Sequence, residues 1–247
     1  MVHYRPSRLI VALSAIGTTV GGLVIFKDYI GGCRYYGEET MHGKTVIVTG
    51  SNCGIGKEVA REFAKRGAKV IMACRDINKC DKSRQEIVLD SNNGQVYCYK
   101  LDLASLRSVR KFAEEVDTKN SFIHLLVNNA GVMRCPHQLT EEGFELQLGV
   151  NHLGHFMLTN LLLDKLKLSA PSRIINVSST AHYRGHIDYD DLNSDKHYDA
   201  AKAYSQSKLA NVLFTKELAN RLKGTEVLTF AVHPGIVNTG DNTTYEF

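Results

Sequence analysis

Several features that would place a chain in a special class are absent from these 247 residues. There is no internal repeat and no tract of low complexity. Charged residues make up 23% and hydrophobic residues 43%, a balance that is ordinary for globular proteins. This balance excludes a disordered chain, a collagen-like chain and a membrane protein with many spans. At about 150 residues per domain, the length predicts one domain with an appendage.

An excess of charge of one sign is also lacking. The net charge at pH 7 is only +4. Basic and acidic residues alternate along the helix-like segments and do not gather into a basic stripe with aromatic residues between them. The sequence therefore argues against a nucleic-acid partner.

The cysteines and histidines show none of the usual metal-site spacings. No C-x-x-C pair occurs, and several cysteines lie in apolar strand-like runs, which predicts buried, reduced thiols in a reducing compartment. The histidines lack the spacing of a ligand cluster and have no carboxylate companion, so we expect no metal site. The six cysteines are Cys33, Cys53, Cys74, Cys80, Cys98 and Cys135.

The amino-terminal region differs in composition from the rest. Residues 9–26 contain no charge, and as a helix they would span about 27 Å, close to the hydrocarbon core of a bilayer. We expect a membrane anchor with a linker in residues 1–43; a cleaved signal peptide, whose apolar part is usually shorter, is the less favoured alternative. Arg5 and Arg8 suit a mitochondrial membrane, the endoplasmic reticulum is the other expectation, and positive charge on both sides leaves the orientation open.

Residues 44–247 alternate apolar strand-like runs with helix-like segments. Strands are expected at residues 44–49, 69–75, 95–102, 124–129, 173–178 and 226–233. Helices are expected at residues 57–66, 105–118, 151–167 and 204–223, with a further charged helix that ends near residue 90. This alternation predicts an α/β domain with a doubly wound, Rossmann-type parallel sheet of six strands and right-handed crossovers.

A glycine-rich turn follows the first predicted strand. The motif T-G-S-N-C-G-I-G occupies residues 49–56 and leads directly into a helix. Gly50 permits a tight turn, while Gly54 and Gly56 let backbone N–H groups approach a pyrophosphate at the positive end of the helix. An ordinary strand-to-helix turn is the alternative. The complete βαβ unit around the motif favours a dinucleotide site.

The end of the second predicted strand bears on the choice of cofactor. An enzyme specific for NAD usually has an acidic residue there that binds the ribose hydroxyls, whereas this strand ends in Arg75. An arginine can pair with a 2′-phosphate, so NADP is favoured over NAD, although Asp76 follows directly. Asp102 follows the third strand, where it could reach the adenine edge or serve as an ordinary acid at a helix start.

Four polar residues further along the chain form a candidate catalytic set. Tyr204 and Lys208 are four residues apart, so on a helix they share one face and the ammonium can stabilise a phenolate. Ser178 and Ser179 end a strand at the sheet edge where ligands collect in such folds, and Asn151 lies in the preceding long helix. Each residue alone has an ordinary structural explanation, but their joint occurrence favours a catalytic site.

These motifs together resemble those of the short-chain dehydrogenase/reductase family, and within it the retinol dehydrogenase group. In family order they are T-G-x-x-x-G-x-G at residues 49–56, N-N-A-G at 128–131, Asn151, Ser179, Y-x-x-x-K at 204–208 and P-G-x-x-x-T at 234–239. The glycine spacing matches the compact branch of the family. The resemblance covers residues 44–239.

The resemblance implies roles for the candidate residues. Tyr204 would be the general acid/base, Lys208 would lower its pKa and hold the nicotinamide ribose, Ser179 would bind the substrate oxygen, and Asn151 would seat a water of the proton relay. The residues implied in binding NADP are Gly50, Ser51, Asn52, Gly54, Ile55, Gly56, Arg75, Asp102, Leu103, Asn129, Ala130, Gly131, Tyr204, Lys208, Pro234, Gly235, Val237 and Thr239.

The expected function is therefore that of a membrane-anchored, NADP-dependent oxidoreductase. It would interconvert a carbonyl and an alcohol on a small hydrophobic substrate, retinal and retinol or a lipid aldehyde. Family members continue past the position of Phe247 with substrate-covering helices and a seventh strand, so the strand at residues 226–233 is expected to be an uncovered edge that favours association, including a homodimer. The alternative is a truncated, non-catalytic nucleotide-binding protein on a membrane, from a shortened isoform or an incomplete gene model.

Overall fold

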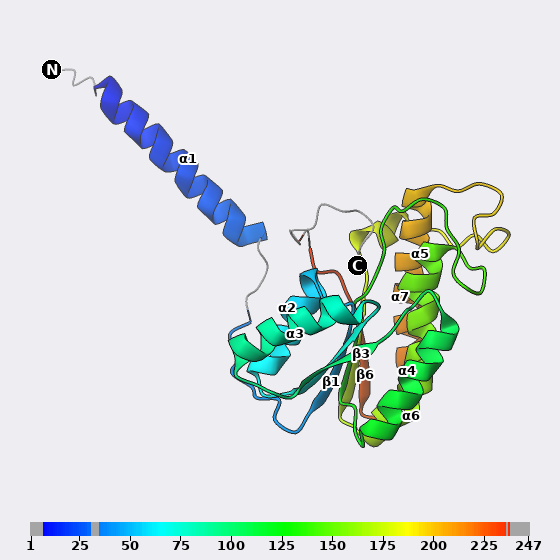
Figure 1. The fold of residues 1–247 in the computed structure, drawn as a ribbon. Helices are drawn as coiled ribbons and strands as arrows, with labels where there is room; N and C mark the ends of the chain where they lie inside the picture. Colours follow the sequence, from blue (N-terminus) through cyan, green and yellow to red (C-terminus); the bar gives the residue numbers. More distant parts are fainter. Residues whose placement is uncertain (1–6, 31–34, 236, 238–247) are drawn as a thin grey trace. The chain divides into compact units, whose positions relative to one another are not determined.

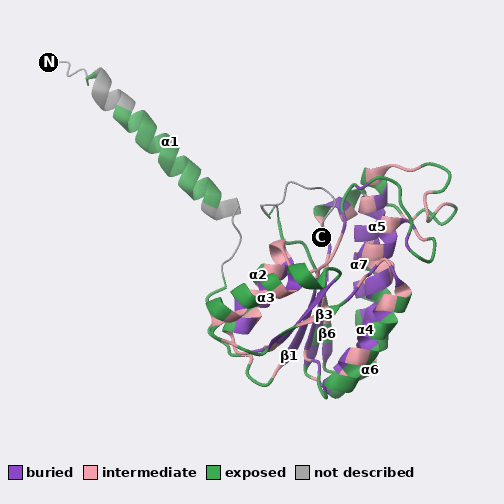
Figure 2. Cartoon of the chain, in the orientation of Figure 1, coloured by how far each residue is buried: buried purple, intermediate pink, exposed green. Residues whose placement is uncertain are grey.

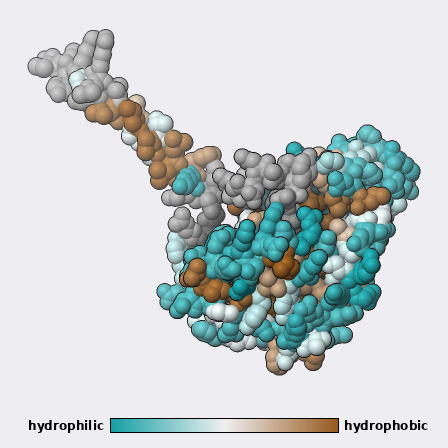
Figure 3. Space-filling model, viewed as in Figure 1, coloured by the Kyte–Doolittle hydropathy of each residue, from teal (hydrophilic) through white to brown (hydrophobic). Residues whose placement is uncertain are grey.

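The computed structural model describes residues 7–30, 35–235 and 237. They belong to two compact units, Met1–Glu39 and Thr40–Phe247. The first unit contains helix α1 (Arg8–Ile30). Along its middle, large apolar side chains such as Leu13, Leu23 and Ile25 are more than half exposed, and this helix appears strongly hydrophobic in Figure 3. Among the described residues, no helix combines the length and the apolar character that crossing a membrane requires.

The second unit is built on a parallel sheet of six strands (Figure 1). The strand order is β3-β2-β1-β4-β5-β6, so the direction of winding reverses between β1 and β4. This confirms the Rossmann-type sheet expected from the sequence. The strands are β1 (Thr45–Thr49), β2 (Lys69–Cys74), β3 (Val96–Lys100), β4 (Leu125–Asn128), β5 (Ser172–Val177) and β6 (Val227–Val232).

Helices cover both faces of the sheet. Helices α2 (Gly54–Lys65) and α3 (Ile77–Ser91) lie on one face, and α4 (Leu106–Lys119), α6 (Gly154–Leu168) and α7 (Ala200–Arg221) lie on the other (Figure 1). Successive side chains of β1 point to opposite faces: Val46 and Val48 pack with α2, whereas Ile47 belongs to the core beneath α4 and α6. Both cores are seen as buried residues along the strands and inner helix faces in Figure 2.

Three helices begin earlier than the sequence predicted, and the first of them is α2, which was expected from residue 57 and begins at Gly54. Helix α7 begins at Ala200 because the Asp199 side chain accepts hydrogen bonds from the first backbone N–H groups, so Tyr204 lies one turn inside the helix. The helix expected from Asn151 begins with a short α5 (Leu146–Leu148). It continues through a π-helical turn, η1 (Gly149–Leu153), before α6.

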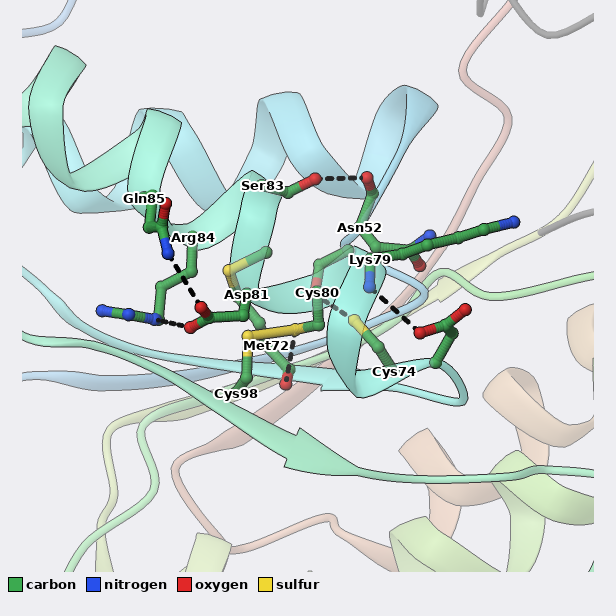
Figure 4. Close-up of a disulfide and its surroundings, with 12 residues drawn as sticks. Asn52, Met72, Cys74, Lys79, Cys80, Asp81, Ser83, Arg84, Gln85 and Cys98 are labelled. Carbon is green, nitrogen blue, oxygen red and sulfur yellow. Dashed lines mark hydrogen bonds and ion pairs between the residues drawn. A yellow bond between two sulfur atoms is a disulfide. The ribbon is translucent and has the colours of Figure 1, made fainter.

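One prediction about the cysteines was wrong. Cys80 on α3 and Cys98 on β3 form a disulfide with a Cα–Cα distance of 6.1 Å (Figure 4). The two residues face each other where α3 packs on the edge strand, within the range that a disulfide can bridge. Cys74 and Cys135 are buried thiols, as expected, and Cys33 lies outside the described residues.

Strand β6 is at the edge of the described sheet, as the sequence predicted. Its side chains Leu228, Phe230 and Val232 are 51%, 41% and 40% exposed. Because these three residues are two positions apart, they lie on one face of the strand, and no described element covers this apolar face.

Candidate active site

The glycine-rich turn between β1 and α2 has a shape that side chains would prevent. Gly50 has a φ of +62°, and a Cβ atom there would lie 2.9 Å from the Cα atom of Ala130. Gly54, at the start of α2, has a φ of +52°. The first turn of α2 contains no acidic residue, so the positive end of the helix dipole is available to an anion.

Side-chain hydrogen bonds hold this turn in place. The hydroxyl of Ser51, which is fully buried, donates to the carbonyl of Val48 at 3.0 Å. From α3, the hydroxyl of Ser83 donates to the carbonyl of Asn52 at 2.6 Å (Figure 4). The turn is thus attached both to the strand before it and to α3, the helix that also carries the disulfide.

A cleft of about 760 Å³ extends from this turn along the carboxyl edge of β1, β2 and β3. Six of the residues that the sequence predicted for the cofactor line it, together with Lys79, Lys82 and Cys135 of the neighbouring segments. The six predicted residues, with Asn52 of the turn among them, are Gly50, Asn52, Arg75, Asp102, Leu103 and Ala130.

Three acidic residues line this cleft, and each of them has a partner: Glu86 pairs with Lys57, while Asp76 and Asp102 accept from backbone N–H groups. Asp76 caps α3 by accepting from the N–H of Lys79 at 3.0 Å, and this bond holds the pKa of Asp76 below its ordinary value. Asp102 accepts from the N–H of Ala104 at 2.9 Å while it also lines the cleft. Asp76 therefore acts as a helix cap and stays ionised, so the case for an anionic group at this place rests on Arg75.

A second cleft, of about 920 Å³, lies on the other side of the turn and shares Asn52 with the first. Gly54, Ile55, Asn129, Pro234 and Val237 line it, all of them predicted cofactor residues. Gly56 lies beneath the turn, with the amide of Asn129 so close that it leaves no space for a Cβ atom. Gly235 has a φ of +83°, and Thr239 lies outside the described residues.

Thr49 and His155 form a buried bridge between the glycine-rich turn and the π-helical turn. The hydroxyl of Thr49 accepts from the N–H groups of Asn129 and Ala130 at 2.9 and 3.0 Å, and it lies 2.8 Å from His155 Nε2. His155 Nδ1 lies 3.1 Å from the carbonyl of Asn151, which can only accept. The proton is therefore on Nδ1, and Nε2 accepts from Thr49. Because burial disfavours the cation, the pKa of His155 is lowered to about 3.

Because of this buried histidine, we expect the free energy of unfolding to fall in acid. In the unfolded chain the pKa of His155 is 6.5, whereas in the folded protein it is about 3. The unfolded state therefore binds the proton first as the pH falls, so the stabilisation is fully present above pH 7 and is lost at lower pH. The expected loss from this residue is about 2 kcal/mol between pH 7 and pH 5. Urea unfolding at pH 5, 6 and 7 would measure it, with His155→Gln as the comparison. If the two stability curves run parallel over this range, the histidine does not cause the loss.

Asn151 connects the strand-exit segment after β4 to α7. Its side chain is fully buried, accepts from the N–H of Val132 at 2.7 Å and donates to the hydroxyl of Ser207 at 2.9 Å. Its carbonyl is close to two donors, His155 Nδ1 and the Asn211 amide, each at 3.1 Å. The resemblance implies that Asn151 seats a relay water, and such a water would have to share this carbonyl with both donors if it bound there.

Ser179 and Tyr204 line a third cleft, of about 360 Å³, together with Met133, Arg134 and other polar residues of η2 (Thr180–Arg184) and α7. The neighbouring Ser178 has a different place: it is buried, and its hydroxyl donates to the carbonyl of Lys208 at 2.9 Å. Of the two serines at the end of β5, Ser179 is the one that can touch a ligand in this cleft.

Lys208 lies behind Tyr204. Its ammonium is 5.7 Å from the centre of the Tyr204 ring and donates to the carbonyl of Val177 at 3.1 Å. Burial lowers the pKa of Lys208 to about 8. The Lys208 ammonium is also close to Gly131, where a Cβ atom would lie 3.5 Å from it and 3.0 Å from Asn151 Oδ1. Gly131 thus leaves space for both polar groups.

Burial determines the protonation of Tyr204 in the chain itself, whereas the lowered pKa that the resemblance implies depends on Lys208 together with the cationic nicotinamide. Burial raises the pKa of Tyr204 above its ordinary value, and the nearby Ser179 hydroxyl and the charge of Arg134 offset only part of this effect. In the chain itself the phenol therefore keeps its proton at neutral pH, which suits proton donation.

Sequence reasoning missed three residues that hold this site together: Thr49, His155 and Asn211. Thr49 was identified only as the first letter of the glycine motif, and His155 was taken for an ordinary helix histidine. Asn211 is three residues beyond Lys208 and bonds the same carbonyl as His155. The spacing of His155, four residues after Asn151, was the one available signal.

Comparisons with known proteins agree with this geometry. A family model described as short chain dehydrogenase matches residues 44–246. Mouse retinol dehydrogenase 13 is 57% identical over 94% of this chain and 70% of its own length. Human retinol dehydrogenase 12 is 55% identical over 87% of this chain and 68% of its own length.

Solved structures show the same fold. An uncharacterized protein from Mycobacterium paratuberculosis matches with a TM-score of 0.73 and 46% identity, covering 83% of this chain and 73% of the other. A metagenomic short-chain oxidoreductase in complex with NADP matches with a TM-score of 0.66 and 26% identity, covering 79% of this chain and 84% of the other. The chain therefore belongs to the short-chain dehydrogenase family and is an oxidoreductase similar to the retinol dehydrogenases.

Proposed function

We propose that this protein reduces a carbonyl compound to an alcohol with NADPH, and that it can catalyse the reverse reaction. One observation carries the proposal: Tyr204 and Ser179 line one cleft, and Lys208 lies behind the phenol. The overall change is carbonyl plus NADPH plus a proton to alcohol plus NADP⁺. The nicotinamide cofactor, when bound, supplies the hydride.

The residues of the chain would handle the proton. Ser179 donates a hydrogen bond to the carbonyl oxygen and aligns it, and Tyr204 gives its phenolic proton to that oxygen as the alcohol forms. The raised pKa of Tyr204 keeps the phenol protonated before the reaction. Lys208, whose ammonium lies 5.7 Å from the centre of the ring, can stabilise the phenolate. Burial brings the pKa of this ammonium down to about 8, and a water between the two groups would carry the returned proton.

The two larger clefts fit a dinucleotide. They meet at Asn52, so together they border the glycine-rich turn where the dipole of α2 favours a pyrophosphate. NADPH is proposed over NADH because Arg75 lines the first cleft while Asp76 is occupied as a helix cap. The NADP bound to the metagenomic relative adds support.

Retinal is the first substrate to test, since the relatives are retinol dehydrogenases by name. Purified protein should oxidise NADPH in the presence of retinal and form retinol, measured by absorbance and by chromatography of the product. Binding of NADPH without turnover of retinal or of medium-chain aldehydes would contradict the proposal. It would favour the non-catalytic nucleotide-binding alternative.

We also propose that α1 attaches the protein to a membrane. The support is the uncharged run of residues 9–26 and the exposed apolar side chains of this helix (Figure 3). The full chain should sediment with membranes and resist alkaline carbonate, and a variant lacking residues 1–39 should be released. Separation of mitochondria from endoplasmic reticulum would test the two expected compartments. A shortened variant that still resists carbonate would show that α1 is not the attachment.

A further inference from the structure

The strand-exit loop after β4 separates the cofactor cleft from the cleft that contains Tyr204. In this loop, Met133 and Arg134 line the Tyr204 cleft, whereas Cys135 and Pro136 line the cofactor cleft. Arg134 has a φ of +52°, a backbone conformation that residues other than glycine rarely adopt. The loop is thus shared by both clefts and is held in an unusual shape.

A single buried amide, Gln147 of α5, holds this loop from behind. Its side chain is fully buried, and its Oε1 accepts from the N–H of Arg134 at 2.7 Å. Its Nε2 donates to the Tyr198 hydroxyl at 2.8 Å and to the carbonyl of Ala200 at 3.0 Å. Ala200 is the first residue of α7, one turn before Tyr204. Gln147 therefore connects a wall of the Tyr204 cleft to the helix that carries the phenol.

Tyr198 completes the connection. Its hydroxyl accepts from Gln147 and donates to the carbonyl of Cys135 at 2.7 Å, and its ring lies 4.7 Å from that of His137. Consecutive residues of the loop, Arg134 and Cys135, are thus bonded to one side-chain pair, one through its N–H and the other through its carbonyl.

The contacts of Gln147 repeat those of Asn151, one helical turn later. Asn151 accepts from the N–H of Val132, two residues before Arg134, and donates to Ser207 of α7. Both amides therefore connect the loop after β4 to α7 or to its start. The fully buried Glu145 supports this arrangement, since its carboxylate accepts from the N–H groups of Gln147 and Leu148.

We propose that Gln147 and Tyr198 are positioning residues for the substrate: through the Arg134 and Cys135 backbone they set the distance between the loop and the phenol of Tyr204. This inference rests on the proposed carbonyl reduction. Neither side chain lines the Tyr204 cleft, and their effect would pass through the loop.

Three variants of the full chain test the proposal. Gln147→Met keeps the volume and removes the hydrogen bonds, and Tyr198→Phe removes one hydroxyl. Asn93→Ala is the matched control, because the partly buried Asn93 side chain bonds the carbonyls of Ala64 and Ala68 and lines none of the three clefts.

We expect Gln147→Met and Tyr198→Phe each to lower kcat/KM for the carbonyl substrate by about tenfold or more, mainly through KM. The dissociation constant for NADPH should stay within about twofold, and the double variant should lose less than the product of the two single effects, since both share one hydrogen bond. Asn93→Ala should keep kcat/KM within about twofold even if its melting temperature falls as far as that of Gln147→Met.

An equal loss of kcat/KM in Asn93→Ala, or none in Gln147→Met, would overturn the proposal. If the unaltered protein reduces no carbonyl compound, the proposed function fails instead, and hydrogen exchange then tests the contact itself. The Arg134 amide should exchange about tenfold faster or more in Gln147→Met and at an unchanged rate in Asn93→Ala. Unchanged exchange in Gln147→Met would overturn it independently of activity.

Discussion

Replacing Tyr204 by phenylalanine should lower kcat for carbonyl reduction by about a thousandfold while the affinity for NADPH stays nearly the same. The variant removes one oxygen from a half-buried ring and leaves the ring, Lys208 and Ser179 in place. What is lost is the proton that the alcohol oxygen must receive. Stopped-flow measurement of NADPH oxidation gives kcat, and fluorescence titration gives the dissociation constant.

Tyr189→Phe is the control for this prediction. Tyr189 is 83% exposed and lines none of the three clefts, so its hydroxyl should make no difference to kcat. Turnover retained in Tyr204→Phe would show that another group donates the proton. Loss of NADPH binding in the same variant would show that the phenol holds the cofactor and has a wider role than proton transfer.

Replacing Arg75 by aspartate should reverse the cofactor preference. In the unaltered protein NADPH should bind more tightly than NADH, because the guanidinium can pair with the 2′-phosphate by charge-assisted hydrogen bonds. The aspartate removes this pair and adds repulsion, so the affinity for NADPH should fall by about a hundredfold while that for NADH changes little or rises. Isothermal titration with both dinucleotides measures each constant.

The matching control is Lys111→Asp, the same change of charge at an exposed position of α4 away from the clefts. It should leave the ratio of the two affinities unchanged. Equal affinities for NADPH and NADH in the unaltered protein would refute the assignment of Arg75, whichever way the variant behaves.

The sequence predicted the sheet well because the signals for it are local. Each strand is a short apolar run, and each expected strand lies within two residues of the observed one; β1, for example, was expected at 44–49 and spans Thr45–Thr49. Helix starts were less accurate. Asp199 as a cap and the π-helical turn around Asn151 depend on contacts of side chains and backbone that periodicity does not reveal.

The candidate site was predicted only in part, because its motifs are local in the sequence whereas the contacts that support it are not. Tyr204, Lys208, Ser179 and Asn151 follow from motifs. The side chains that hold them, such as His155 and Gln147, do not, since each bonds groups that come together only when distant segments pack. The disulfide between Cys80 and Cys98 was missed because cysteine spacing says nothing about which helix side faces which strand.

The strand order also determines when this site can exist during folding. Strands β1, β2 and β3 pair with near neighbours in the chain, as in the contacts of Val46 with Val70 and of Val70 with Val96. This half could form soon after its synthesis. The pairing of Val46 with Leu125 closes a much longer loop, and long-range pairings of this kind form slowly. Thr49 meets Asn129, and the dinucleotide clefts acquire their second wall, only after that step. Recovery of NADPH binding during refolding should therefore report the joining of the two halves, after most of the helical signal has returned.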